Sequence, residues 1–214
     1  MKKKIFLAGG AGYIGSVLTE HLLKKNYEVL VYDDFRYNEN SLNHLYHNKN
    51  LNIIKGDVCD INRIKSVVHN YEYIIPLAAL VGAPICNLKK NEASSVNKKS
   101  ILELFKIIKK NQKIIMPTTN SAYGTGDKNN FCDEDSKLKP ISKYAKDKVE
   151  IEKKLIKKSN FISLRLATVF GMSQRMRMDL LVNDFVYRAL REKVILLYEG
   201  GFKRNYIHVA DVAR

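Results

Sequence analysis

Short apolar runs alternate with amphipathic stretches through the first three quarters of the chain. The apolar runs predict buried strands, and the stretches with apolar residues every three or four positions predict helices. The strands are expected at Ile5–Ala8, Glu28–Tyr32, Leu51–Ile54, Tyr73–Leu77, Lys113–Pro117 and Phe161–Leu166. The helices are expected at Ser16–Lys25, Glu39–His47, from a cap at Asp60 to about His69, Glu92–Lys110 and Pro140–Lys158. This alternation predicts an α/β fold of right-handed βαβ units, in which helices cover both faces of a doubly wound parallel sheet.

The pattern changes after Gly171. We expect a helix over Met178–Arg191, short strands at Val194–Leu197 and Asn205–Val209, and a helix beginning within Ala210–Arg214. The change divides the chain into a main domain at 1–170 and a partial substrate-binding region at 171–214. Because the second part is so short, the sequence predicts an incomplete small C-terminal domain, as in a fragment of a longer protein.

Composition and charge narrow the class of protein. The 214 residues carry 37 basic and 22 acidic side chains, a net charge of +15, but the lysines are scattered along the expected helices. Such scattering is typical of solvated helix faces and not of nucleic-acid binding, although a positive field would favour a nucleotide-linked substrate. No apolar run is long enough to cross a bilayer. The three separated cysteines predict neither disulfides nor a metal site, which fits a cytoplasmic protein with no membrane partner.

A glycine-rich turn joins the first strand to the first helix. Gly9, Gly12 and Gly15 form G-x-x-G-x-x-G, and the helix N-terminus that follows would offer free N–H groups to a pyrophosphate. Asp33 ends the second strand, 18 positions after Gly15, where a carboxylate can accept from both ribose hydroxyls and repel a 2′-phosphate. The turn therefore predicts a Rossmann dinucleotide site that favours NAD over NADP. Arg36 weakens this preference, because an arginine there could neutralise a phosphate.

The end of the third strand carries a second candidate cofactor contact. Asp57 could accept a hydrogen bond from the adenine amino group, and Val58 could pack on the ring, since ligands bind at the carboxyl ends of parallel strands. The alternative is that Asp57 is only a turn residue.

A tyrosine and a lysine stand four residues apart in the expected helix Pro140–Lys158. The spacing places Tyr144 and Lys148 on one helix face, where an ammonium group would lower the phenol pKa toward neutrality. Such a tyrosine can take a proton from a sugar hydroxyl during hydride transfer. The pair alone could arise by chance in a Lys-rich helix. It gains weight from the segment 118–124, TTNSAYG, whose hydroxyl groups follow the fifth strand.

These motifs together resemble those of the extended short-chain dehydrogenases, in the NAD-dependent epimerase/dehydratase family that acts on nucleotide sugars. The resemblance covers essentially the whole chain. It rests on the glycine turn, Asp33, Asp57-Val58, Leu77-Ala78-Ala79, Asn97, Thr119–Gly124, Tyr144 with Lys148, Arg165–Gly171 and Arg204–Val212.

The resemblance implies roles for individual residues. The catalytic triad would be Thr119, Tyr144 and Lys148. NAD would be bound by Gly9, Gly12, Tyr13, Ile14, Gly15, Asp33, Asp57, Val58, Leu77, Ala78, Ala79, Tyr144 and Lys148. The nucleotide-sugar substrate would be bound by Val81, Asn120, Ser121, Thr168, Arg175, Arg177 and Arg204, with the arginines on its phosphates. The family resemblance also implies a homodimer.

Departures from the family pattern narrow the reaction. Nucleotide-sugar 4,6-dehydratases usually have Asp-Glu after the catalytic Thr, whereas this chain has Asn120-Ser121, which cannot act as an acid–base pair. The segments 76–86, 118–126 and 166–185 are similar to bacterial enzymes that oxidise C4 of GDP-heptose or epimerise related sugars for capsule or lipopolysaccharide. In that interpretation Val81–Leu88 is a loop over the sugar. The sequence thus predicts an NAD-dependent epimerase or 4-dehydrogenase. The alternatives are a dehydratase, a non-catalytic NAD-sensing module and a basic nucleic-acid-binding protein.

Overall fold

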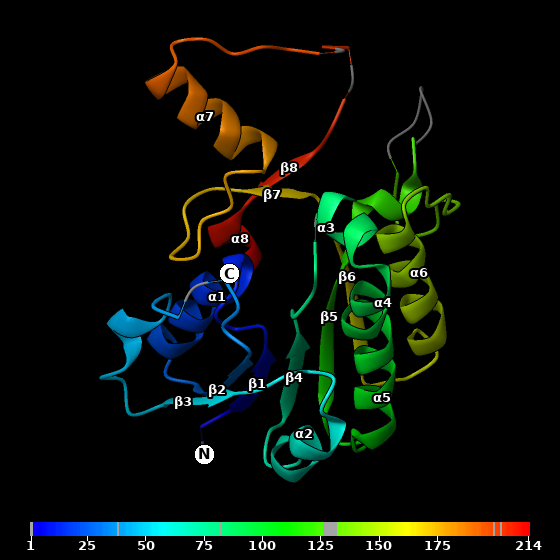
Figure 1. The fold of residues 1–214 in the computed structure, drawn as a ribbon. Coiled ribbons are helices and arrows are strands. Elements are labelled where there is room, and N and C mark those ends of the chain that lie inside the picture. The colour runs from blue at the N-terminus through cyan, green and yellow to red at the C-terminus, as the bar shows by residue number, and fades with distance from the viewer. Residues whose placement is uncertain (1, 38, 82, 126–131, 199, 202) are drawn as a thin grey trace.

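A single parallel sheet organises the computed structural model, which describes residues 2–37, 39–81, 83–125, 132–198, 200–201 and 203–214. Its strands are β1 (Lys4–Ala8), β2 (Glu28–Asp33), β3 (Leu51–Lys55), β4 (Tyr73–Pro76), β5 (Lys113–Thr119) and β6 (Phe161–Leu166). Their order is β3-β2-β1-β4-β5-β6, and every neighbouring pair is parallel (Figure 1). The chain returns to the middle of the sheet between β3 and β4. The predicted doubly wound parallel sheet is confirmed.

Alternate residues of each strand build two cores, one on each face of the sheet. Phe6 and Ala8 of β1 pack with residues of α2 (Ile61–Val68), α5 (Ser100–Ile107) and α6 (Lys143–Leu155). Ile5 and Leu7 point the other way and pack with α1 (Tyr13–Lys24) and the segment around Leu42. Burial on both faces explains why the central strands β1, β2 and β4 are continuous apolar runs, whereas β3, β5 and β6 alternate between more buried and more exposed residues.

The prediction of a helix over Glu39–His47 is wrong. The structure has turns there and one short 3₁₀ segment, η1 (Asn43–Leu45). Asparagine side chains hydrogen-bond locally, with Asn43 Nδ2 3.0 Å from Asn40 Oδ1 and Asn48 Oδ1 accepting from Asn50 N at 2.9 Å. Such bonds offer the backbone an alternative to the helix. The predicted strand Val194–Leu197 is also wrong: those four residues are exposed and belong to no sheet.

Several helix bounds differ from the prediction. The stretch expected as one helix, Glu92–Lys110, is divided into α4 (Lys90–Ser94), a π-helical turn η2 (Ser95–Lys99) and α5. Helix α6 begins at Lys143 because Ser142 Oγ accepts from Ala145 N at 3.1 Å and caps the helix. Helix α7 (Leu181–Arg191) starts three residues later than expected. The predicted loop Val81–Leu88 is helical over α3 (Ala83–Leu88), and Gly82 lies outside the described residues.

A second, small sheet follows the main one. β7 (Thr168–Phe170) pairs in parallel with β8 (Tyr206–His208), which is shorter than the strand expected at Asn205–Val209, and α8 (Val209–Ala213) follows directly. Helix α8 packs beside α1, which brings the end of the chain close to its first helix (Figure 1). Of the helices in the described ranges, none has both the length and the apolar character needed to span a membrane.

Gly9 provides a test of how tightly the turn after β1 is built. Its φ is +85°, and a Cβ at this position would lie 2.5 Å from the backbone N of Ala78. Gly9→Ala should therefore lower the free energy of unfolding by about 2 kcal/mol or more, because conformational strain and the clash with backbone both act against it. Denaturant titration of the variant measures this loss.

Gly200→Ala is the matched control, because a Cβ there meets nothing within 4 Å. Equal stability of the two variants would show that the turn relaxes freely and that the close approach of Gly9 to Ala78 is unimportant.

Candidate active site

The glycine turn places the start of α1 at the carboxyl edge of the sheet. A Cβ at Gly15 would lie 2.0 Å from the carbonyl oxygen of Gly9, so only glycine allows this turn and helix to pack so closely. Gly12 is the N-cap of α1 and has no side chain with which to cap it. The N–H groups of Tyr13, Ile14 and Gly15 have no carbonyl partner within the helix. They present the donors and the positive dipole end that a pyrophosphate requires.

Asp33 lies next to this turn, at the end of β2. Its two carboxylate oxygens accept from the backbone N–H groups of Ala11 (2.9 Å) and Phe35 (2.8 Å). Burial raises the pKa of this carboxyl, while the two backbone donors oppose that rise. The bonds fix the carboxylate beside the glycine turn, and each oxygen keeps a further lone pair for a ribose hydroxyl. The glycine turn and this acid fit a dinucleotide such as NAD.

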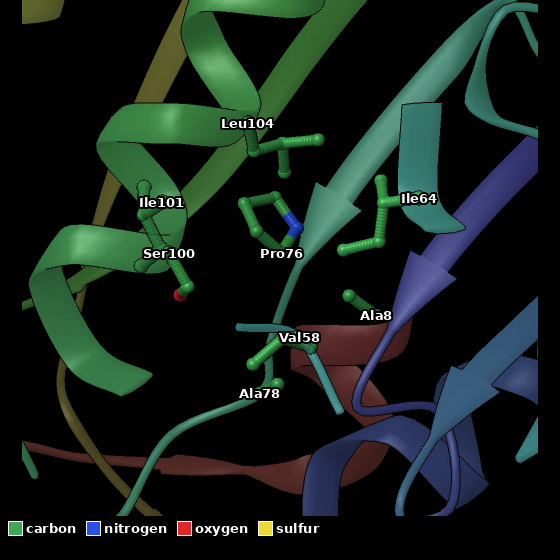
Figure 2. Close-up of a pocket in the computed structure, with 8 residues that line it drawn as sticks. All are labelled: Ala8, Val58, Ile64, Pro76, Ala78, Ser100, Ile101 and Leu104. Atoms are coloured by element: carbon green, nitrogen blue, oxygen red, sulfur yellow. The ribbon is translucent and has the colours of Figure 1, made fainter. Parts of the chain in front are cut away.

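A small apolar pocket lies behind the strand ends, between the sheet and α5. Figure 2 shows Val58 and Ala78 together at one end of it, with Leu104 of α5 at the other end and Pro76 on its wall. The cavity measures only about 10 Å³ and is too small for an adenine ring, so the packing of adenine on Val58 stays a prediction. Asp57 is exposed and its Oδ1 accepts from Cys59 N at 2.8 Å, so it does serve as a turn residue. Its contact with adenine stays a prediction.

Three candidate catalytic residues come from two neighbouring elements at the same edge. Thr119 ends β5 and its Oγ1 accepts from Ser121 N at 3.1 Å, which caps the 3₁₀ turn η3 (Asn120–Tyr123). Helix α6 packs against η3 and carries Tyr144 in its first turn. Lys148 lies one turn later, with its Nζ 5.7 Å from the centroid of the Tyr144 ring. Its side chain is buried, only 3% of the residue being exposed.

Burial dominates the titration of both members of the pair. It raises the pKa of Tyr144 to about 12, although the charge of Arg177 acts to lower it. It lowers the pKa of Lys148 to about 8, against the opposing effect of Asp147. The expectation that Lys148 brings the phenol pKa toward neutrality is therefore wrong for this structure. Desolvation of the Tyr144 phenol outweighs the lowering effect of the Arg177 charge, so the phenol is protonated at neutral pH.

A buried ion pair braces the end of β5 from behind. Glu152 of α6 accepts from Arg165 Nη2 at 2.5 Å and from Ser163 Oγ at 2.7 Å. Arg165 also donates to the hydroxyl of Tyr123 at 3.0 Å and so reaches η3. The pair fixes α6 to β6 and to the turn that follows Thr119. Arg165 occurs among the family-like segments of the sequence, but Glu152 gives no signal of its own within a charged helix.

Asn97 holds the chain that follows β4. Its amide group makes two hydrogen bonds to Leu80, accepting from the backbone N at 2.7 Å and donating to the carbonyl O at 2.8 Å. It lies in the π-helical turn η2 and is buried. The segment with Leu77, Ala78 and Ala79 is thereby fixed beside the glycine turn. A buried polar residue on the apolar face of a helix is the sequence signal for this role.

The segment after β7 is bonded to the N-terminus of α1. The Tyr13 hydroxyl donates to Gly171 O at 2.7 Å and accepts from Asn183 Nδ2 at 3.2 Å. Ser173 Oγ donates to Tyr13 O at 2.7 Å. The predicted cofactor residue Tyr13 therefore joins the two parts of the chain. Residues 171–183 are held close to the glycine turn.

The predicted substrate residues are spread around this region. Arg177 pairs with Asp179 at 2.5 Å and lies near enough to Tyr144 to affect its pKa. Arg175 instead stacks on the ring of Tyr37, with its guanidinium 4.2 Å from the centroid, on the ribose side of the site. The remaining positions are more open or bonded elsewhere. Thr168 and Val81 are half-buried, Ser121 and Arg204 are exposed, and Asn120 donates to Asn205 Oδ1 at 2.6 Å.

Fold and site together define a dinucleotide-binding Rossmann protein. The sequence profile of the NAD dependent epimerase/dehydratase family matches residues 5–214. This chain belongs to that family. It is an enzyme of the extended short-chain dehydrogenase type, and NAD is its cofactor.

Comparisons with individual proteins agree with this assignment. A UDP-N-acetyl-alpha-D-glucosaminuronate decarboxylase of Bacillus cytotoxicus is 32% identical over 64% of this chain and 43% of its own length. The structure of a UDP-N-acetylglucosamine 4-epimerase of Methanobrevibacter ruminantium, in complex with UDP-N-acetylmuramic acid, is 26% identical, with a TM-score of 0.87 over 100% of this chain and 71% of that one. A UDP-glucuronic acid 4-epimerase of Bacillus cereus, in complex with UDP-glucuronic acid and NAD, is 25% identical, with a TM-score of 0.82 over 98% and 70%. The chain thus spans less than half of the first of these relatives and about 70% of the other two.

Proposed function

We propose that this chain carries the redox site of a nucleotide-sugar 4-epimerase or 4-dehydrogenase. The observation that supports the proposal is the gathering of Thr119, Tyr144 and Lys148 at the strand edge that also carries the glycine turn. A non-catalytic sensor would need only the glycine turn and Asp33. Burial of the Lys148 ammonium group is unfavourable for folding. Such a costly residue is expected where it serves the reaction, here by stabilising the Tyr144 phenolate during hydride transfer.

The three side chains can handle the proton of a sugar hydroxyl. The Tyr144 oxygen would take the proton from the C4 hydroxyl, while Thr119 Oγ1 would hydrogen-bond the same sugar oxygen and hold it in line. For this the phenol must first lose its own proton to solvent, and Lys148 would stabilise that phenolate. When the phenolate takes the proton from the sugar, it becomes the neutral phenol again. NAD, when bound, supplies the acceptor for the hydride that leaves C4. The result is a 4-keto sugar. An epimerase would rotate this intermediate within the site and return the hydride to its other face, whereas a dehydrogenase would release it.

Two features of the site bear on the rival reactions. Asn120 and Ser121 stand beside Thr119, and the Asn120 amide is hydrogen-bonded to Asn205. Neither residue offers a carboxyl group for elimination of water, so we favour an epimerase or dehydrogenase over a 4,6-dehydratase. Arg177 lies close to Tyr144 and is our candidate for the substrate phosphates, together with Arg204 on the stretch before β8.

The names of the relatives indicate which base and which sugar the substrate carries. The relatives described above act on or bind UDP-linked sugars, by their names. We therefore put UDP-linked sugars first, and GDP-heptose, with a role in capsule or lipopolysaccharide synthesis, second. The division into a cofactor domain at 1–170 and a substrate region at 171–214 belongs to the same proposal, as do a homodimer and a cytoplasmic location.

A panel of UDP- and GDP-sugars with NAD tests the proposal. NADH absorbance and chromatography of the sugar nucleotides are followed together. A 4-epimerase should interconvert C4 epimers with little NADH released, whereas a dehydrogenase should accumulate NADH in proportion to product. NAD binding with no conversion of any sugar would favour the non-catalytic module. Salt-dependent DNA binding without NAD binding would favour the nucleic-acid-binding protein.

A further inference from the structure

Charged side chains from two distant segments meet beside Asp33. Arg36 Nε lies 2.5 Å from Asp34 Oδ2, and Arg36 Nη1 lies 2.6 Å from Oε1 of Glu92. The other Glu92 oxygen lies 3.1 Å from Lys89 Nζ. Glu92 belongs to α4, on the far side of β4 in the sequence, so this contact joins the ribose end of β2 to the helix that follows α3. The groups line an open pocket of about 400 Å³, formed by Asp34, Arg36, Tyr37, Ile85, Lys89 and Glu92.

An arginine at this place ordinarily favours NADP. A guanidinium a few residues after the ribose-binding acid can pair with a 2′-phosphate through two parallel hydrogen bonds. In this chain the two edges of the Arg36 guanidinium are already directed to carboxylates, one on each side. The nearby cation Arg175 is likewise engaged, on the ring of Tyr37. A 2′-phosphate would have to displace the Glu92 carboxylate before it could bind the Nη1 edge of Arg36.

We propose that Glu92 determines cofactor choice by holding Arg36 away from the 2′-phosphate position. Glu92 would contact neither the ribose nor its phosphate. It is a positioning residue, because it acts only by holding Arg36. Without its carboxylate, the Nη1 edge of Arg36 and the ammonium of Lys89 would both lack their acidic partner. Asp33 alone would then oppose NADP. The inference rests on the cofactor assignment and not on the sugar chemistry.

Calorimetric titration with NAD and with NADP, in the absence of any sugar, tests this inference. Glu92→Ala should bind NADP about tenfold more tightly than the wild type, as expected for one charge-assisted hydrogen bond gained. NAD affinity should change by no more than about twofold. Glu103→Ala is the matched control, because Glu103 is an exposed helical glutamate paired with a lysine, Lys106, and its loss changes the net charge equally.

The double variant Arg36→Ala/Glu92→Ala separates positioning from simple charge. If Glu92 acts through Arg36, NADP affinity in the double variant returns to about the wild-type value. Unchanged NADP binding in Glu92→Ala would overturn the inference, and so would an equal gain in Glu103→Ala or a gain that persists without Arg36. A protein that binds NAD but converts no sugar would sink only the proposed function, since these titrations contain no substrate.

Discussion

Tyr144→Phe should reduce turnover of the nucleotide sugar by about 10³-fold while leaving NAD affinity nearly unchanged. The substitution removes one oxygen, the only atom of the side chain that can take the proton from the C4 hydroxyl, and general acid–base groups contribute about 10²–10⁴ to rate. The ring that packs under Lys148 Nζ is kept, so the fold around α6 should be preserved. Stopped-flow measurement of NADH formation, with calorimetry of NAD binding, checks both parts.

Tyr187→Phe is the control for this prediction. Tyr187 is an exposed tyrosine of α7 whose hydroxyl accepts from Arg191 Nη1 at 2.6 Å, so the same atom is lost at a place without proposed chemistry. Its turnover should match that of the wild type. If Tyr144→Phe kept full activity, the proton would leave by another route, and the assignment of the phenol as acid–base group would be wrong.

The central strands β1, β2 and β4 were predictable because each one is a continuous run of mostly apolar residues buried on both faces. The edge strand β6 alternates instead and exposes Ile162 and Leu164. Ile5–Ala8 and Phe161–Leu166 could be read without any knowledge of their neighbours. Val194–Leu197 is also an apolar run, but it pairs with no strand of the described residues, and an apolar run becomes a strand only when a sheet edge is there to pair with it. Pairing partners lie far away along the chain, and a local pattern does not contain them.

The site was predictable in its parts and not in its electrostatics. The spacing of Tyr144 and Lys148 indicates a shared helix face, and the structure places the ammonium over the ring. Whether the phenol pKa rises or falls depends on how far atoms from other elements exclude water from the side chain. The spacing of residues along one helix does not contain this information. Arg36 shows the same limit. The sequence gives an arginine near Asp33, but its partner Glu92 stands 56 positions away and carries no motif.

Lys148→Met should make the protein more stable at neutral pH by about 2–3 kcal/mol while abolishing turnover. Burial lowers the pKa of Lys148 from an ordinary 10.5 to about 8. Between pH 8 and 10.5 the unfolded chain therefore holds a proton that the folded chain has released, so wild-type stability should rise with pH across this window. Below pH 8 the folded state bears the full cost of a buried ammonium, about 3 kcal/mol for 2.5 pKa units. Methionine has a similar length and no charge, so it removes this cost.

Thermal and denaturant unfolding at several pH values measure this effect, with Lys146→Met as control. Lys146 is exposed on the same helix, so its replacement should change stability by less than about 0.5 kcal/mol. The gain of Lys148→Met should be largest below pH 8 and shrink toward pH 10.5, and the variant should lose the wild-type rise. A variant less stable than the wild type at pH 7 would show that Lys148 is held by favourable contacts and is not strained. The expected result would mean that the protein accepts a less stable fold in order to keep a cation beside the Tyr144 phenol, where the proposed proton transfer takes place.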